Sequence, residues 1–325
     1  MNGSTLDGGG LALIWPLSAI AVACVAALSF YPALTLGRRG RIAAFLLLGT
    51  AIASAPLVIP PDQRLARFFA AVFAAILLMK MWDLHVGALR ENRLPFRDFL
   101  AFLVNLPFLV LRRQGFEGQP TQQENLLHLG LGVLGVGAAL AALELLSRFD
   151  WSGLPFLLEH SFKATAFFLG LIAVFQLSAA TARLLGGYTV NPGGWFLTAS
   201  TPAEFWRRYN RIVGQFLHED VFKPLQGRQH PVRTTLMVFA VSGLLHEYLF
   251  SVAIGRLQGF QFLFFLLQGF AVALTQRVNP VGREAVAWGF GTFAFNVISS
   301  VFFLASVHGV TEFYQGGLPT WLRGW

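Results

Sequence analysis

The sequence predicts an all-α protein, a polytopic bundle of transmembrane helices. Hydrophobic residues make up 55% of the 325 residues and charged residues only 12%, with a mean hydropathy of +0.60. Soluble domains carry about 25% charged residues. Long apolar stretches recur along the whole chain, and the basic residues collect in the loops between them. These three observations exclude an ordinary soluble domain.

About eight apolar stretches are long enough to cross a hydrocarbon core of about 30 Å. A shorter segment, roughly 98–111, carries Asn105 and Pro107 between flanking arginines, so we expect it to be re-entrant or interfacial. The eight expected spans lie at roughly 11–36, 42–59, 65–82, 126–147, 158–183, 233–254, 259–276 and 285–306.

The basic residues predict how the chain is oriented. With these spans, 18 of the 24 Lys and Arg residues fall on one side of the membrane. The positive-inside rule makes that side cytoplasmic and puts both termini on the other side. The first ten residues hold no Lys or Arg and do not resemble the start of a cleaved signal peptide, so we expect the first span to be a retained anchor.

Composition also bounds the domains and partners. No linker or low-complexity run interrupts the apolar stretches, so residues 1–325 are expected to form one membrane domain. The net charge is +8, and the basic residues lie in loops that border hydrocarbon. Their expected partners are therefore anionic lipid headgroups or a phosphate-bearing cosubstrate, not nucleic acid. Cys24 is the only cysteine, which leaves disulfides and Cys-based zinc sites unsupported. The oligomeric state stays open.

The segment 201–217 has the strongest helix signals in the chain. Thr201 and Glu204 have the spacing of a capping box, and Pro202 falls at the first helical position. As one helix it would collect its aromatic and aliphatic side chains in one arc, with Arg207, Arg208 and Arg211 on the other side. We therefore expect an interfacial helix. Asn210 falls at the border of the arc beside Trp206, where its amide can face a buried site.

A histidine lies within the apolar run 238–254. Ser242 precedes His246 by one turn, and Glu247 follows it directly. Ionisable residues at bilayer depth are costly and usually functional, although a hydrogen-bonded contact between helices is the simpler explanation. Imidazole can take up a proton near neutral pH and return it, so His246 is a candidate general base.

Two functions fit these residues. In an acyltransferase, a hydroxyl deprotonated by His246 attacks an activated acyl carbonyl, and the amide of Asn210 orients the reactants or bonds the developing oxyanion. In a proton-coupled lipid or solute transporter, His246 and Glu247 would form a proton relay. Such carriers usually show inverted repeats with interrupted helices, and none is visible here, which favours the enzyme.

Three motifs resemble the membrane-bound O-acyltransferase family, most closely its wax synthase-like and its sterol and diacylglycerol acyltransferase branches. The motifs are TPAEFWRRYN (201–210), VGQFLHEDVFKPL (213–225) and SGLLHEY (242–248). The resemblance implies that His246 is the catalytic base and Asn210 its partner. It also implies a cytosolic acyl-CoA donor, a lipophilic alcohol as acceptor, an ester released into the bilayer, and no further cofactor.

The resemblance and the predicted orientation together suggest which residues contact the substrates. The 201–217 helix would lie on the cytoplasmic side, where its arginines can bind CoA phosphates. We expect Trp206, Arg207, Arg211, Ser242 and Glu247 to contact acyl-CoA or the acceptor. The expected location is the plasma (inner) membrane of a bacterium or the endoplasmic reticulum of a eukaryote.

Four further features of the sequence are not assigned to the acyl-transfer site. We expect Lys80, Asp83 and His85 to form a solvated interfacial cluster, with contact to a cosubstrate as the alternative. His218, Glu219 and Asp220 are adjacent and cannot all face one metal ion on a helix, so no metal site is expected. Asn296, Ser299 and Ser300 share a helical face and either line a cavity or pack against a neighbouring helix. The Phe-rich runs 260–270 and 290–303 either line an acyl tunnel or face lipid.

Overall fold

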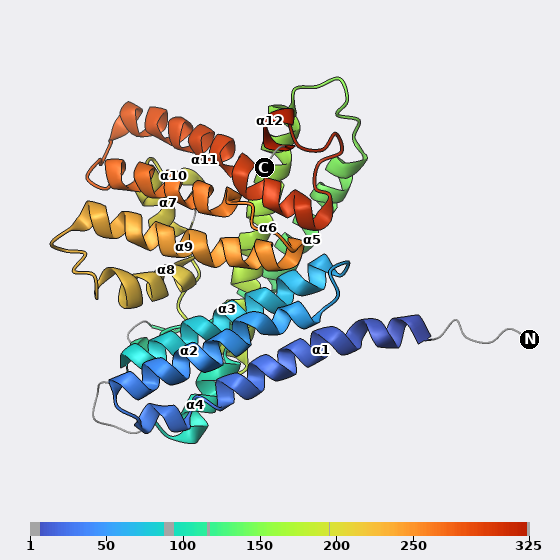
Figure 1. The fold of residues 1–325 in the computed structure, drawn as a ribbon. Coiled ribbons are helices and arrows are strands. Elements are labelled where there is room, and N and C mark those ends of the chain that lie inside the picture. The colour runs from blue at the N-terminus through green and yellow to red at the C-terminus, as the bar shows by residue number, and fades with distance from the viewer. Residues whose placement is uncertain (1–6, 88–93, 116–117, 195, 324–325) are drawn as a thin grey trace, which may run out of the picture. The chain divides into compact units, whose positions relative to one another are not determined.

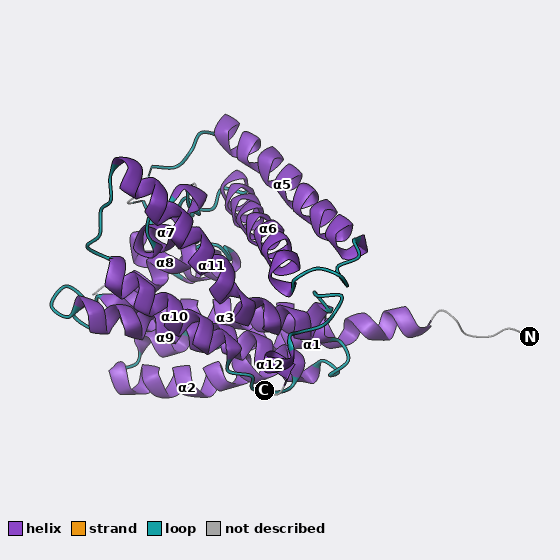
Figure 2. Cartoon of the chain, turned by 90° about the horizontal axis from the view of Figure 1, so that it is seen from above, coloured by secondary structure: helices purple, strands orange, loops and turns teal. Residues whose placement is uncertain are grey.

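The computed structural model describes residues 7–87, 94–115, 118–194 and 196–323. Within these residues the regular structure is entirely helical, which confirms the all-α prediction (Figures 1 and 2). Seven of the described helices are long and apolar enough to cross a membrane. Two of these spans include a 3-10 turn: Leu13–Thr35 takes in most of α1 (Asp7–Leu28), and Arg38–Val58 extends α2 (Arg38–Ser54). The other five are α3 (Arg64–Gly87), α5 (Gln122–Arg148), α6 (Phe156–Leu184), α9 (Pro231–Ile254) and α11 (Gly282–Thr311).

The eighth expected span, 259–276, is a shorter helix. α10 covers Phe260–Thr275, and its 16 residues rise only about 24 Å, less than a hydrocarbon core of about 30 Å. The segment near 98–111 is also short, with α4 at Phe96–Val104 followed by irregular chain and a 3-10 turn at Leu111–Arg113. This agrees with the expectation that it does not span. The orientation of the chain across the membrane stays a prediction.

The chain folds as two compact units. One contains residues 1–104 and 245–257, and the other contains residues 105–244 and 258–325. α9 contributes its first part to the second unit and its last part to the first. That residues 1–325 form a single domain stays a prediction.

In the first unit, α1, α2 and α3 lie side by side (Figure 1). Their contact faces are rich in alanine, and Ala19, Ala27, Ala71 and Ala74 are all buried. Such small side chains let helix backbones approach closely, which is the usual basis of helix association in lipid.

The end of α9 is fixed to the first unit by hydrogen bonds. Tyr248 donates its hydroxyl to the carbonyl of Ala53 at 2.9 Å, and Arg67 donates its Nε to the carbonyl of Ile59 at 2.7 Å. A second guanidinium nitrogen of Arg67 lies 3.5 Å from the carbonyl of Val252. The region that carries His246 therefore belongs to a well-anchored helix.

The expectation of a solvated cluster at the end of α3 is wrong. Lys80, Asp83 and His85 are all buried, with Lys80 completely covered. Lys80 donates its Nζ to the carbonyl of Phe102 at 2.6 Å and lies 4.2 Å from the centre of that ring. α4 therefore covers Lys80, while the ring of His85 packs against that of Trp82, with centroids 5.5 Å apart. The position of these residues near the end of a span had suggested exposure to solvent, because the sequence does not show which helix packs beside them.

In the second unit, α5 and α6 form a long antiparallel pair (Figure 2). Glycine allows the close approach: a Cβ on Gly132 would lie 2.9 Å from the Cβ of Leu177, and a Cβ on Gly135 would lie 2.8 Å from that of Ala173. Outside this seam α5 is mostly exposed, as expected of a helix that faces lipid.

α6 also carries a buried polar cluster against α11 and the chain that follows it. His160 lies 2.6 Å from the hydroxyl of Tyr314 and 2.7 Å from the carbonyl of Val297, while Lys163 pairs with Glu159 at 2.6 Å. The contact of His160 with Tyr314 holds the chain after α11 against α6. α12 (Thr320–Arg323) is held separately, by Leu322, which is buried in a cluster with Phe260, Val301 and Ala305.

The segment 201–217 is not one helix, contrary to the expectation. It forms two short helices, α7 (Pro202–Arg208) and α8 (Arg211–Leu217), separated at Tyr209 and Asn210. The single arc of apolar side chains expected for this segment therefore does not exist. A π-helical turn, His218–Phe222, continues α8.

Candidate active site

The break between α7 and α8 is built by a glycine loop that precedes them. The N–H of Arg211 donates to the carbonyl of Pro192 at 2.9 Å, and the N–H of Gly194 donates to the carbonyl of Arg208 at 3.3 Å. Gly193 has φ 148°, and a Cβ there would lie 2.2 Å from the carbonyl oxygen of Arg208. Only glycine permits this approach, so the loop replaces the hydrogen bonds that a continuous helix would have made.

Asn210 adopts the left-handed conformation at the break, with φ 41° and ψ 59°. Asparagine tolerates this conformation better than most residues. Its Oδ1 accepts a hydrogen bond from the N–H of Val213 at 3.3 Å and thereby caps α8. The Nδ2 group has no hydrogen-bond partner within the described residues. Asn210 therefore has a structural role, and it keeps an amide donor that a ligand can use.

α7 begins as the sequence predicts. The hydroxyl of Thr201 accepts from the N–H of Glu204 at 3.2 Å, and Pro202 occupies the first turn. The carboxylate of Glu204 bonds the N–H of Ser200 at 2.7 Å, not that of Thr201, so the capping box is only half formed.

The neighbouring arginines of α7 differ in their partners. Arg208 pairs with Glu204 and donates to the hydroxyl of Thr198 at 2.8 Å. Arg207 is exposed and has no ion-pair partner in the part of the chain that the structure describes. Arg207 is therefore available for an anionic ligand, whereas Arg208 stabilises α7 itself.

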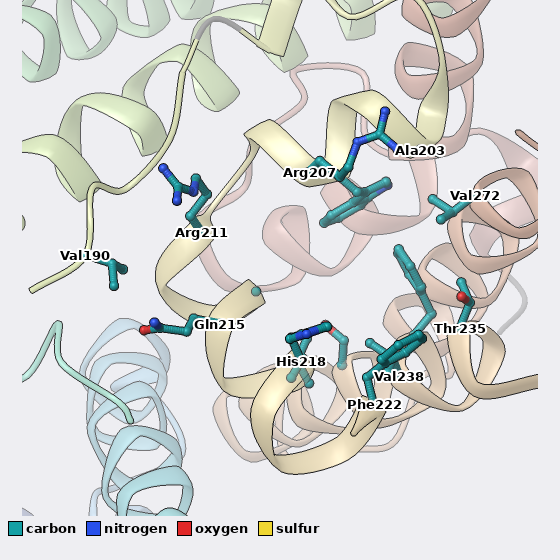
Figure 3. Close-up of a pocket in the computed structure, with 15 residues that line it drawn as sticks. Val190, Ala203, Arg207, Arg211, Gln215, His218, Phe222, Thr235, Val238 and Val272 are labelled. Carbon is teal, nitrogen blue, oxygen red and sulfur yellow. The ribbon is translucent and has the colours of Figure 1, made fainter. Parts of the chain in front are cut away.

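A pocket of about 420 Å³ lies between α7, α8, the π-turn and the first half of α9 (Figure 3). Arg207, Arg211, Gln215 and His218 are among its polar residues, and Val238, Phe239 and Val272 are among its apolar walls. The remaining lining residues are Val190, Ala203, Trp206, Gly214, Leu217, Phe222, Thr235 and Ser242. A mostly apolar cavity with a few placed polar groups is typical of a ligand site.

A buried glutamine holds one wall of this pocket. Gln268 of α10 accepts from the indole Nε1 of Trp206 at 2.9 Å and donates to the hydroxyl of Ser299 at 2.9 Å. The Trp206 ring also meets Phe239 edge-on, with centroids 5.2 Å apart. Trp206 is thus fixed on two sides, by a hydrogen bond and by ring packing.

Gln268 was not among the residues expected from the sequence. The sequence did contain a signal for Gln268: it is an amide within an apolar run, and a polar side chain inside the membrane is costly unless it is paired. Its bonds also settle one open alternative. Asn296 and Ser299 bond Gln268, and Ser300 lies 3.1 Å from Nε2 of His160, so all three are helix-packing contacts.

The π-turn below the pocket is held by ion pairs. Glu219 pairs with Arg113 and with Lys223, the latter at 2.8 Å, and Asp220 pairs with Arg112. Burial alone raises the pKa of Glu219, but the hydrogen bonds and charges of Arg113 and Lys223 outweigh it and leave the pKa below its ordinary value of 4.5. Both carboxylates thus anchor the turn from which His218 enters the pocket.

The structure places the expected site residues in three groups. Trp206, Arg207, Arg211 and Ser242 line the pocket. Asn210 lies at the break between α7 and α8, outside the lining. His246 and Glu247 belong to the last part of α9, in the other unit. Their catalytic and binding roles stay predictions.

Helical geometry relates Ser242 to His246. Thr235, Val238, Phe239 and Ser242 line the pocket from one face of α9, at the spacing of one helical stripe, and His246 lies one further turn along that stripe. His246 is half-buried. Glu247 is buried and 3.4 Å from the hydroxyl of Ser251, on a different face of the helix.

Comparison with known proteins identifies the family. A search of curated proteins finds no match. A sequence model of the membrane-bound O-acyltransferase family matches residues 142–308, just over half of the chain. The matched region contains α6 to α10 and nearly all of α11, and with them the whole pocket and His246. Together with its helical membrane architecture, this match shows that the chain belongs to the membrane-bound O-acyltransferase family.

Proposed function

We propose that this O-acyltransferase moves an acyl group from acyl-CoA to the hydroxyl of a lipophilic alcohol, as a wax synthase does. The observation that carries the proposal is the pocket beside α7, where Arg207 lies exposed and unpaired among the described residues at the edge of apolar walls. The family match supports an enzyme over the proton-coupled transporter.

The chemistry of the pocket suits one part of the donor. Guanidinium groups bind phosphates through charge-assisted, often bidentate hydrogen bonds, which favours Arg207 and Arg211 as partners of the CoA phosphates. The walls formed by Val238, Phe239 and Val272 suit the less polar part of the donor that leads to the thioester.

We assign the proton transfer to His246. Its imidazole removes the proton from the acceptor hydroxyl, and the resulting oxygen attacks the thioester carbonyl carbon. The new C–O bond forms as the carbonyl becomes an oxyanion, which the Nδ2 of Asn210 stabilises. Collapse breaks the C–S bond, and the proton held by His246 passes to the departing thiolate. The products are an ester and free CoA.

In this proposal the ester enters the bilayer from which the lipophilic acceptor came, and membrane lipids are the third partner. The donor approaches from the cytoplasmic side, as the distribution of basic residues suggests. The host membrane would be the plasma (inner) membrane in a bacterium or the endoplasmic reticulum in a eukaryote.

The first test asks which acyl donor and which acceptor the enzyme uses. Purified protein is incubated with a membrane lipid extract and with the same labelled acyl chain carried on CoA or on acyl carrier protein, and the labelled product is identified by mass spectrometry. We expect label in an ester of a long-chain alcohol with the CoA donor only. Labelling of a different hydroxyl class would replace the acceptor, and equal use of both donors would remove the role assigned to CoA.

The two arginines make the CoA contact testable. Arg207→Gln is expected to raise the Michaelis constant for acyl-CoA and to weaken its dependence on salt, because screening acts on that charge pair. Arg208→Gln removes the same charge from the same helix but loses its bond to Glu204 and should mainly lower thermal stability. If both variants changed only stability, the pocket would not bind the phosphates of CoA.

A further inference from the structure

A second cavity lies at the beginning of α9, on the loop that follows the π-turn. It has a volume of about 290 Å³ and is lined by Pro224, Leu225, Gln226, His230, Arg233, Thr234 and Met237. None of these residues lines the pocket assigned to acyl-CoA. Nothing in the proposed reaction uses this cavity.

The polar half of the cavity is built for an anion. Arg233 and His230 are exposed, and their side chains have no hydrogen-bond or ion-pair partner among the residues that the structure describes. Gln226 adds an amide donor from a backbone position at φ 56°. No acidic residue lines the cavity. Two nitrogen-bearing side chains and an amide without a counter-charge fit a phosphate group.

The start of α9 strengthens the same site. His230, Arg233 and Thr234 belong to the first turn of this 24-residue helix or directly precede it. The backbone N–H groups of a first helical turn carry partial positive charge. The hydroxyl of Thr234 donates to the carbonyl of Leu225 at 3.3 Å and ties the loop to the helix, which fixes the shape of the cavity.

The other half of the cavity is apolar and open. Leu225 and Met237 are 44% and 46% exposed, and Pro224 lies beside them. α9 is one of the helices that are long and apolar enough to span the membrane, so its first turn lies near the depth of lipid phosphates. The apolar surface therefore adjoins the polar half of the cavity, and it can contact the first methylenes of a lipid whose phosphate binds there.

We propose that this cavity binds the phosphate headgroup of an anionic membrane phospholipid through Arg233, His230 and Gln226, with the glycerol and first methylenes against Leu225 and Met237. Its size is below the usual range for whole drug-sized ligands, about 300–1,000 Å³, and suits a headgroup. A zwitterionic lipid is disfavoured because no acidic side chain is present to hold its cation. The site does not depend on the proposed acyl transfer.

The test measures melting of the full chain in a neutral detergent at constant ionic strength. Short-chain phosphatidylglycerol, short-chain phosphatidylcholine and inorganic phosphate are added at matched concentrations. We expect phosphatidylglycerol to raise the melting temperature of the wild-type protein more than the other two. An equal shift with phosphatidylcholine would overturn the preference for an anionic headgroup, and an equal shift with phosphate alone would overturn the assignment to lipid.

Variants locate the effect. Arg233→Gln should weaken the apparent affinity for phosphatidylglycerol roughly fivefold, and Arg233→Gln with His230→Gln should abolish the shift. Arg233→Lys keeps the charge and should retain most of it. Arg228→Gln removes an exposed charge from the same loop but lines neither cavity, so it should leave the shift unchanged. Native mass spectrometry of co-purified lipid gives a second readout that does not depend on melting, and undiminished lipid on the double variant would overturn the site.

Discussion

Replacing Asn210 by aspartate, glycine and alanine separates its structural role from its proposed catalytic role. The side chain has two ends: Oδ1 caps α8 through the N–H of Val213, and Nδ2 is the donor proposed for the oxyanion. Aspartate keeps an acceptor for the cap but has no amide donor. Glycine keeps the left-handed backbone and lacks both the acceptor for the cap and the amide donor. Alanine loses both ends and strains the backbone at φ 41°.

The expected magnitudes differ for each variant. Loss of a helix cap costs about 1 kcal/mol when alanine replaces asparagine but only a few tenths with glycine, and the left-handed conformation costs about 1–2 kcal/mol with alanine. Asn210→Ala should therefore be less stable by about 2–3 kcal/mol, with Asn210→Gly and Asn210→Asp close to wild type. Turnover should fall roughly 10²–10³-fold in all three, because each lacks the donor.

The assay pairs thermal unfolding in detergent with initial rates of ester formation by the same preparations. Asn210→Asp is the decisive variant, because its fold is expected to be intact. If it kept near wild-type turnover, the amide would not bond the oxyanion, and the role of Asn210 would be limited to shaping the break between α7 and α8. If Asn210→Gly were as unstable as Asn210→Ala, the left-handed backbone would not explain the choice of asparagine.

Three further predictions concern the surroundings of the pocket. Gln268→Leu should release the indole of Trp206 and change the Michaelis constant or the acyl-chain preference more than the melting temperature, whereas a pure loss of stability would show that Gln268 only packs helices. Arg207→Gln should weaken acyl-CoA binding with little effect on melting, measured by titration at two salt concentrations, and Arg208→Gln should show the reverse. The pKa of Glu219 is lowered in the folded protein, so the ion pairs of Glu219 stabilise the fold above pH 4.5, and this stabilisation is lost as the pH falls through the lowered pKa. Glu219→Gln should therefore flatten the pH dependence of the melting temperature in that range. An unchanged pH profile would refute the contribution of these ion pairs.

Much of the fold could be predicted from the sequence because lipid imposes simple rules. Seven of the eight expected spans correspond to long apolar helices, since a continuous apolar run has few alternatives in a membrane. The run 259–276 also folds as a helix at the expected place, Phe260–Thr275, but with 16 residues it is shorter than the other seven. Its last residue, Thr275, donates its hydroxyl to the carbonyl of Ala271 and accepts from the N–H of Ala203, a tertiary contact that hydropathy does not show.

The break at Asn210 could not be predicted from the local pattern. Thr201, Pro202 and the spacing of apolar side chains all favour one helix, and each signal is local. What interrupts the helix is the loop that precedes α7, in which Gly193 allows the chain to reach the carbonyl of Arg208. A tertiary interaction therefore overrode a strong local preference.

The site was predicted in part for similar reasons. The spacing of Ser242 and His246 on one stripe of α9 follows from helical periodicity and needs no knowledge of the fold. The contrast between Arg207 and Arg208 has a local signal that the sequence analysis did not use: Arg208 follows Glu204 by four residues, the favoured spacing for an ion pair on a helix. Burial of Lys80 and Asp83, by contrast, depends on a neighbouring helix.

The most direct test of the central claim is the rate of ester formation from labelled acyl-CoA by the wild-type protein and by His246→Gln in the same membrane. Glutamine can hydrogen-bond as histidine does but cannot accept the proton, so it isolates general base catalysis from packing. We predict that the variant inserts, folds and binds acyl-CoA like the wild type while its rate falls roughly 10²–10⁴-fold. A folded His246→Gln protein that forms ester at near wild-type rate would contradict the account.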